Sequence, residues 1–224
     1  MNLVKSQDYF DPIDVTKRCH IIGCGSVGSN IAELLARLGI TKISLYDFDY
    51  VSPHNLANQM FVNSDIKRLK VDAVRDLICA INPDAEPDIE IHSEGYTDNT
   101  RLSGYVFLCV DNIDLRREIA TKNRFNQSIK AMFDFRTRLE DAQHYAADWS
   151  QSPMVENFIK SMDFSHDEAK EFTPVTACNV EMGVAPTVRI VCAFGVSNFM
   201  NFIRKKEIKK IITIDAFNFD IEAY

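Results

Sequence analysis

The stretch that decides the fold is Cys19-His20-Ile21-Ile22-Gly23-Cys24-Gly25-Ser26-Val27-Gly28. Its first four residues form a short apolar run, which is typical of a buried strand. Apolar side chains then recur at helical spacing as far as Gly39, a good helix stop signal. A second apolar run, 43–46, ends at Asp47. A strand, a glycine-rich turn, a helix and a second strand predict parallel pairing through a right-handed connection.

The three glycines of this GxGxxG turn have separate mechanical purposes. Gly23 permits a tight turn, Gly25 lets a phosphate approach the backbone, and Gly28 lets helix and strand pack closely. The helix that follows, opening near Ser26, offers unpaired N–H groups and partial positive charge to an anion. Because a strand precedes the turn and a helix follows it, the sequence predicts nucleotide binding here. The alternative is a tight turn in an α/β protein without a ligand.

The same alternation of strands and helices continues through the first 135 residues. Apolar runs predict strands over 89–91, 105–110 and 131–135, and helical periodicity predicts helices over 65–80 and 114–127. With the first unit these elements predict a doubly wound, mostly parallel, Rossmann-like sheet over residues 18–135, after a polar lead-in of residues 1–17.

Residues 136–224 differ in character. Strands predicted at 144–147 and 211–219 indicate a C-terminal antiparallel extension, and the apolar stretch 184–203 is typical of a buried helix. Residues 150–174 are polar and acidic, which predicts a long crossover loop. We expect the whole chain to form one α/β domain.

Composition argues against nucleic-acid-binding and membrane-spanning classes of protein. The chain has 25 Lys+Arg against 32 Asp+Glu, a net charge of −7, which argues against a nucleic-acid binder with a general basic surface. A basic surface turn is expected only locally, at 204–210. There is no apolar signal core at the N-terminus and no run of about 18 apolar residues, so we expect no membrane span. The six cysteines form no CxxC pair, which favours reduced thiols and a cytoplasmic location.

One further run is specific to a single family. Residues 47–59, DFDYVSPHNLANQ, resemble the signature D-x-D-x-V-x-x-x-N-L-x-R-Q of the ThiF/MoeB/HesA family. Other segments resemble that family's motifs in the same order: 65–71, Asn82-Pro83, Val110-Asp111-Asn112 with Arg116, and 178–186. The resemblance covers about residues 18 to 203. It implies the nucleotide-binding fold with which ubiquitin-activating enzymes and their bacterial relatives adenylate carboxylates.

The resemblance implies roles for the residues whose types match. Asp47, at the end of the second strand, would hold the ribose, and Lys70 would neutralise the triphosphate. Asp111 would hold Mg²⁺, a hard cation that takes carboxylate and phosphate oxygens. The remaining nucleotide-site residues on this basis are Gly23, Gly25, Ser26, Gly28, Asp49, Asn55, Asn58, Gln59 and Asn112.

Three residues near the predicted site carry open alternatives. Cys178 lies in the family's cysteine-bearing segment and would receive an acyl group or take part in sulfur transfer; the alternative is a structural thiol on a loop. Arg136 and Arg138 follow the fifth strand, at the edge where ligands bind in such sheets. Each would meet substrate or form a surface ion pair.

The sequence departs from the family pattern at Asn58, where the family has an arginine that meets the outer phosphates. A missing guanidinium at a phosphate is expected to weaken ATP turnover. Candidates to replace it are Arg18, Lys67, Arg68 or an arginine of a partner subunit. Many family members also carry two CxxC pairs, which this chain lacks, so we expect no structural zinc.

Three interpretations follow for function. The first is an enzyme, an ATP- and Mg²⁺-dependent adenylyltransferase that acts as a homodimer on the C-terminal carboxylate of a ubiquitin-like or sulfur-carrier protein ending in Gly-Gly. The second is a degenerate family member that binds nucleotide or a partner without chemistry, which Asn58 favours. The third, an NAD-dependent oxidoreductase, is disfavoured because residues 47–59 and Lys70 have no role in it.

Overall fold

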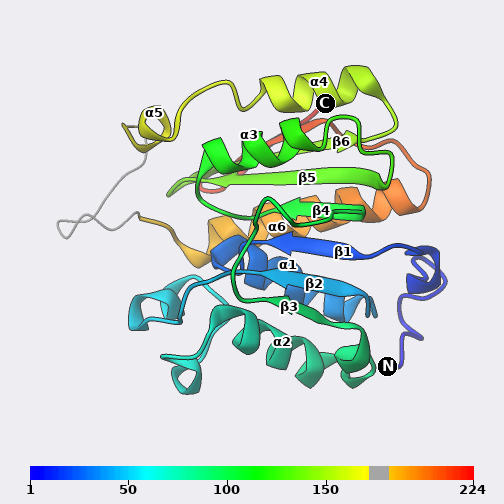
Figure 1. Cartoon of the computed structure of the whole chain (residues 1–224), viewed down its shortest axis with the longest axis vertical. Helices are drawn as coiled ribbons and strands as arrows, with labels where there is room; N and C mark the ends of the chain where they lie inside the picture. The colour runs from blue at the N-terminus through cyan, green and yellow to red at the C-terminus, as the bar shows by residue number, and fades with distance from the viewer. Residues whose placement is uncertain (172–181) are drawn as a thin grey trace.

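The computed structural model describes residues 1–171 and 182–224. In that part of the chain an eight-stranded sheet has the order β3-β2-β1-β4-β5-β6-β7-β8 (Figure 1). The strands are β1 (Cys19–Ile22), β2 (Ile43–Tyr46), β3 (Glu90–His92), β4 (Gly104–Leu108), β5 (Ile129–Thr137), β6 (Asp141–Asp148), β7 (Ile211–Asp215) and β8 (Asp220–Ala223). The α-helices are α1 (Ser26–Arg37), α2 (Lys70–Ile81), α3 (Ile113–Lys122), α4 (Ser152–Lys160), α5 (His166–Glu171) and α6 (Ala185–Ile203).

The sheet confirms the predicted fold class. Strands β3, β2, β1, β4 and β5 pair in parallel, and β5 to β8 pair antiparallel. Alternate residues of the central strands face opposite layers, as the pleat requires. Ile21 and Phe107 belong to the core formed with α1, α2 and α6, whereas Ile22 and Leu108 belong to the core formed with α3 and α4. Because both faces are covered, these strands are mostly apolar, with His20 in β1 and Ser44 in β2 as buried polar exceptions.

The C-terminal strand prediction was wrong in one respect. Residues 211–219 do not form a single strand: β7 ends at Asp215, residues 216–219 form a turn, and the chain returns as β8 to complete a hairpin. The Asp215 carboxylate accepts hydrogen bonds from the backbone N–H groups of Phe217 and Asn218. Phe219 then takes a positive φ of 62°. An aspartate that binds the backbone just beyond it is a typical turn former.

The predicted crossover loop at 150–174 was also wrong, because α4 and α5 occupy most of it. Pro153 lies in the first turn of α4, where a missing N–H costs nothing. The helix buries Met154, Val155 and Phe158 in the core beside α3. The helix is short and lies among polar and acidic residues, so the segment 150–174 as a whole has the composition of a loop. Residues 172–174 of the predicted loop lie outside the described residues.

Two predicted helices have shifted ends. The helix predicted over 65–80 begins at Lys70, because Leu69 is extended and bridges to Tyr50. Before it the chain forms a short 3-10 helix, Asn63–Asp65, and a turn in which Lys67 has a φ of 73°. The helix predicted over 114–127 runs from Ile113 to Lys122, and the side chain of Asn123 closes it by donating to the Ile119 carbonyl. The apolar helix predicted over 184–203 is confirmed as α6. Among the described helices, none has the length and apolar character needed to cross a membrane.

Candidate nucleotide site

The glycine-rich turn joins β1 to α1 at the carboxyl edge of the sheet, with the geometry that the spacing predicts. Gly23 has φ of 94°, and a Cβ there would lie 2.8 Å from the Val110 nitrogen. A Cβ on Gly28 would lie 1.8 Å from the Gly23 carbonyl oxygen, so only glycine permits this close packing. A Cβ on Gly25 would meet nothing within 4 Å. No side chain of the described residues caps the first turn of α1, so its N–H groups face an open space in which an anion fits.

A cavity of about 690 Å³ lies in front of this turn and gathers most of the predicted site residues. Those that line it are Gly23, Gly25, Ser26, Asp47, Asp49, Asn55, Asn58, Gln59, Lys70 and Asp111. Gly28 packs beneath the turn, and Asn112 instead caps α3 by accepting from the Leu115 N–H at 3.1 Å. Cys178 lies outside the described residues.

Asp47 ties the end of β2 to the glycine turn. One carboxylate oxygen accepts from the Cys24 N–H at 2.7 Å, and the other accepts from the Asp49 N–H at 2.8 Å. Burial raises the pKa of Asp47, against the effect of these two hydrogen bonds. Each oxygen keeps a second acceptor direction, so a carboxylate fixed in this way can still bind a hydroxyl.

Lys70 places one cation in the cavity. Its backbone N–H donates to the Asp49 carbonyl at 2.9 Å, and its ammonium lies 2.7 Å from an Asp49 carboxylate oxygen. The lysine is 8% exposed, at the first position of α2. Both partners line the cavity, so Asp49 holds the ammonium at its wall.

The signature run forms a compact 3-10 turn, Pro53–Ala57, beside the cavity. Buried Asn55 stabilises the turn by accepting from the Ser52 N–H at 2.8 Å. Asn58 makes only a long contact, 3.5 Å, with the Gly183 carbonyl. The side-chain oxygen of Gln59 is buried and has no hydrogen-bond partner within the described residues. A buried polar atom in this state calls for a partner from outside the chain or from water.

Two of the candidates to replace the missing arginine at position 58 are used elsewhere. Arg18 lies just before β1, at the amino ends of the parallel strands and away from the cavity. There it donates to the Asp88 carbonyl at 2.8 Å and pairs with Glu90. Arg68 pairs with Asp65 and Asp76. Neither of them lines the cavity, nor does exposed Lys67. Among the described lysines and arginines, Lys70 alone lines it.

Asp111 is exposed at the end of β4 and lines both this cavity and an adjoining one of about 730 Å³. Within the described residues its carboxylate makes no hydrogen bond or ion pair, and Asn112 rather than Asp111 caps α3. The backbone just before it is fixed, because the Nε of Arg116 donates to the Val110 carbonyl at 2.6 Å. The result is a free carboxylate on an anchored loop, which suits a cation ligand.

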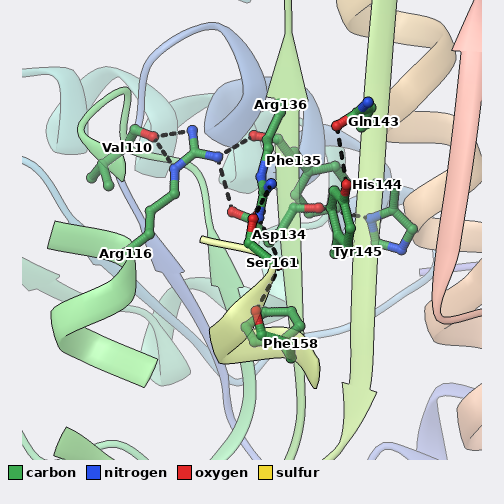
Figure 2. A network of polar contacts seen from close by, with 10 residues as sticks. All are labelled: Val110, Arg116, Asp134, Phe135, Arg136, Gln143, His144, Tyr145, Phe158 and Ser161. Atoms are coloured by element: carbon green, nitrogen blue, oxygen red, sulfur yellow. Dashed lines mark hydrogen bonds and ion pairs between the residues drawn. The ribbon is translucent and has the colours of Figure 1, made fainter. Parts of the chain in front are cut away.

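Figure 2 shows how Arg116 is itself held by a buried carboxylate that sequence reasoning missed. Asp134 is fully buried; one oxygen accepts from Arg116 at 2.9 Å and the other from Arg136 at 2.7 Å. Arg136 also donates to the carbonyl and the hydroxyl of Ser161 and lies 4.1 Å from the centre of the Tyr145 ring. Its guanidinium is therefore already committed, although it lines the adjoining cavity. The signal that was available is a charged residue inside the apolar run 131–135.

Arg138, the other arginine left open between substrate contact and surface pairing, also lines the adjoining cavity and lies 3.8 Å from the Asp141 carboxylate. Its side chain is 53% exposed, so this ion pair is weak and screened by solvent. Arg138 therefore remains available to a ligand, unlike Arg136.

His144 is buried behind this network and is neutral. Its Nδ1 lies 3.0 Å from the Asp134 carbonyl and its Nε2 lies 3.2 Å from the Asn198 amide nitrogen. Since the amide nitrogen can only donate, Nε2 accepts and Nδ1 carries the proton. Burial lowers the pKa of His144 to about 4. The protonated ring has no acceptor for a second N–H here.

Because His144 is buried as a neutral ring, we expect the free energy of unfolding to fall in mild acid. Between pH 6.5 and 4 the unfolded chain binds a proton at His144 that the folded chain does not, so stability falls as pH falls. We expect a loss of about 2 kcal/mol between pH 7 and pH 5 from this residue, measured by urea unfolding. In His144→Gln the pH dependence should shrink, with a remainder from His20, whose pKa burial also lowers to about 4. The control is His54→Gln, because His54 is exposed and its replacement should leave the pH dependence of stability unchanged. A weaker pH dependence in His54→Gln would contradict the assignment of the effect to the buried histidines.

The sheet order, the glycine turn and the cavity at the carboxyl edge place the chain in the class of doubly wound α/β proteins that carry a ligand site at that edge. The chain belongs to the ThiF family, whose sequence model matches residues 14–223. The family resemblance of the sequence motifs is thereby confirmed.

Relatives and solved structures agree with this assignment. Ubiquitin-like modifier-activating enzyme 5 of Caenorhabditis elegans is 30% identical over 119 residues, which are 46% of this chain and 28% of that protein. The Drosophila simulans protein of the same name is 36% identical over 137 residues, 53% of this chain and 32% of that protein. The matched segments thus span about a third of these relatives' length.

Two crystal structures share the fold. That of E. coli MccB with ATP matches with a TM-score of 0.72 at 18% identity, covering 100% of this chain and 71% of that one. That of PaaA matches with a TM-score of 0.69 at 17% identity, covering 96% of this chain and 65% of that one. At such identities the similarity concerns the fold, a mostly parallel core with antiparallel C-terminal strands.

Proposed function

We propose that this ThiF-family, E1-like adenylation domain uses ATP and Mg²⁺ to activate the C-terminal carboxylate of a ubiquitin-like or sulfur-carrier protein ending in Gly-Gly. The observation that carries the proposal is the convergence of the open first turn of α1, the Lys70 ammonium and the free Asp111 carboxylate on one cavity. The relatives named as modifier-activating enzymes support the same substrate class.

The residues present fit this ligand. The space beside Gly25, which a Cβ would enter, admits a phosphate against the backbone. The buried oxygen of Gln59 has no partner among the described residues and would accept from an exocyclic amine or a hydroxyl. When bound, ATP supplies the electrophilic α-phosphorus, and Mg²⁺ takes up charge on the outer phosphates.

The chain's own residues would bring two anions together. The α1 N–H groups and Lys70 offset the charge of phosphate and carboxylate, which is the main obstacle to their reaction. Asp111 would hold Mg²⁺, which keeps several waters and needs few protein ligands. The substrate carboxylate would enter from the adjoining cavity, which shares Ser26 and Asp111 with the nucleotide cavity.

Cys178 stays our candidate acceptor for a later acyl or sulfur transfer. The described cysteines nearest the glycine turn do not suit that role, because burial raises the pKa of both Cys24 and Cys109 well above the usual value. A nucleophilic cysteine needs the opposite shift. The homodimer and the lack of structural zinc also stay predictions.

The proposal is tested by ATP–pyrophosphate exchange with candidate Gly-Gly proteins, together with calorimetric titration of ATP and NAD. We expect exchange that depends on the carboxylate partner, and binding of Mg·ATP in preference to NAD. Tight NAD binding without ATP binding would refute the nucleotide assignment. ATP binding without exchange for any partner would favour the second candidate, a binding module, to which the uncharged Asn58 points.

Asn58→Arg is expected to raise ATP affinity. Neither Arg18 nor Arg68 reaches the cavity, so the added guanidinium should occupy a place that the described residues leave without a cation. A charged hydrogen bond contributes about 1.5–3 kcal/mol, roughly a 10- to 100-fold gain in affinity. The measurement is calorimetric ATP titration, with Asn58→Gln as the uncharged control. No gain, in a protein already active in exchange, would support relocation of the cation, with an arginine of a partner subunit as the remaining candidate.

A further inference from the structure

A third cavity, of about 670 Å³, lies at the amino ends of the parallel strands, opposite the nucleotide site. It is lined by residues that precede or begin strands: Lys17 before β1, Tyr105 in β4 and Lys130 in β5. The other wall is the basic turn between α6 and β7, which Figure 1 shows on the same side of the molecule as the N-terminus. The nucleotide cavity lies at the carboxyl ends of the same parallel strands, so the two sites are separated by the length of these strands.

Five lysines line this cavity in a protein whose net charge is −7: Lys17, Lys130, Lys205, Lys206 and Lys210. Within the described residues none of the five side chains makes an ion pair or a hydrogen bond. Like charges closer than the Debye length of about 8 Å repel one another. A cluster of unpaired ammonium groups therefore favours an anionic ligand that offsets this repulsion.

The acids in the same cavity only partly offset the lysines. Among the described residues, three carboxylates, those of Asp14, Asp148 and Glu207, line it against five lysines. Asp148 accepts hydrogen bonds from Ser150 and Gln151, and these neutral partners leave its charge in place. Glu207 lies 3.3 Å from the ammonium of Lys209, which is outside the cavity lining, so the cavity keeps an excess of positive charge.

The wall also has an apolar part. Tyr105 and Met154 are buried, and Phe202, Ile203 and Ile208 are partly buried, beside the lysines. None of the arginines that the structure describes lines the cavity, although arginine is the side chain best suited to phosphate through its planar fork. Flexible lysines around apolar side chains suit carboxylates spaced along a peptide that also carries an apolar side chain.

We propose that this cavity is a docking site for an acidic peptide segment of a partner protein, anchored by an apolar side chain. The carboxylates would pair with the lysines, and the anchor would contact Met154 and Ile208. A partner bound here leaves the carboxyl edge of the sheet open, so docking and nucleotide binding are compatible. The inference does not depend on the chemistry proposed for the nucleotide site.

The test is fluorescence polarisation of the full chain with a short labelled peptide of glutamates around one central leucine. We expect binding that weakens as salt is raised, and no binding of the same peptide with glutamine in place of glutamate. Lys130→Glu combined with Lys206→Glu should weaken binding about tenfold or more, which corresponds to about 1.4 kcal/mol. Both lysines are exposed, so thermal unfolding should be unchanged.

The matched control is Lys42→Glu combined with Lys160→Glu, which makes the same change in charge at exposed lysines outside the cavity. Retained binding in this control supports a defined site. An equal loss in both double variants would overturn the proposal, since it would reflect net charge alone. Failure of the acidic peptide to bind, with or without binding of single-stranded RNA or phosphatidylserine vesicles, would overturn it as well.

Discussion

Asp134→Ala is expected to lower the free energy of unfolding by about 3–5 kcal/mol. The substitution removes a fully buried carboxylate and leaves two arginines without their ion-pair partner. Arg116 lies 2.9 Å from one Asp134 oxygen and Arg136 lies 2.7 Å from the other. Arg116 is itself buried, with 6% of its surface exposed, so its charge has little access to bulk water once the partner is removed. The measurement is urea unfolding of the full chain at neutral pH.

The matched control is Asp141→Ala, which removes a half-exposed carboxylate 3.8 Å from Arg138. A solvent-exposed pair of this kind contributes up to about 1 kcal/mol. The expected loss at Asp134 is a large part of the 5–15 kcal/mol that holds a typical domain folded. If that variant does not fold, Asp134→Asn, which keeps the shape and one acceptor, should give an intermediate loss. Equal, small losses at both sites would show that the buried network does not stabilise the fold.

The parallel half of the sheet is readable from sequence because each of its signals is local. Gly23 and Gly28 indicate the turn directly, because the backbone there admits only glycine. The run 19–22 indicates a strand because both faces of β1 are covered by the core. Most residues of the candidate nucleotide cavity were named from the sequence, but by two routes. Asp47 follows from its place at the end of a predicted strand, whereas Lys70 came from the family resemblance alone, because the helix was predicted to begin at residue 65. The family motifs then identified which of these polar residues face a common space.

What the sequence did not reveal depends on contacts between distant segments. The helix α4 is stabilised by packing Met154 and Phe158 beside α3, and with nine residues it is too short to be stable by itself. Asp134 gains its role only from Arg116 on another element. The lysine cavity is likewise assembled from segments that meet only when the sheet forms. For the same reason, the place of Arg18 at the amino ends of the parallel strands was not foreseen when it was considered as a replacement for the missing arginine.

Asp111→Ala is expected to abolish adenylation, with a loss of at least about 100-fold in ATP–pyrophosphate exchange, while leaving the fold intact. Removing one group that offsets charge in a transition state costs about 10²–10³ in rate. Asp111 is exposed and makes no hydrogen bond or ion pair with the described residues, so its removal should change stability by no more than about 0.5 kcal/mol. A large loss of activity at constant stability is the mark of a ligand-binding carboxylate.

The control is Asp114→Ala, three positions further on in the first turn of α3, which removes a carboxylate paired with Arg117 at 2.8 Å but outside the nucleotide cavity. It should leave exchange close to the wild-type rate. A second readout separates metal binding from catalysis: Mg²⁺ should strengthen ATP binding to the wild-type chain in calorimetry and should do so much less in Asp111→Ala. Wild-type exchange in that variant, or undiminished Mg²⁺ dependence of ATP binding, would remove Asp111 from the metal site. In that case the anchoring of the Val110 carbonyl by Arg116 would serve the packing of α3 alone.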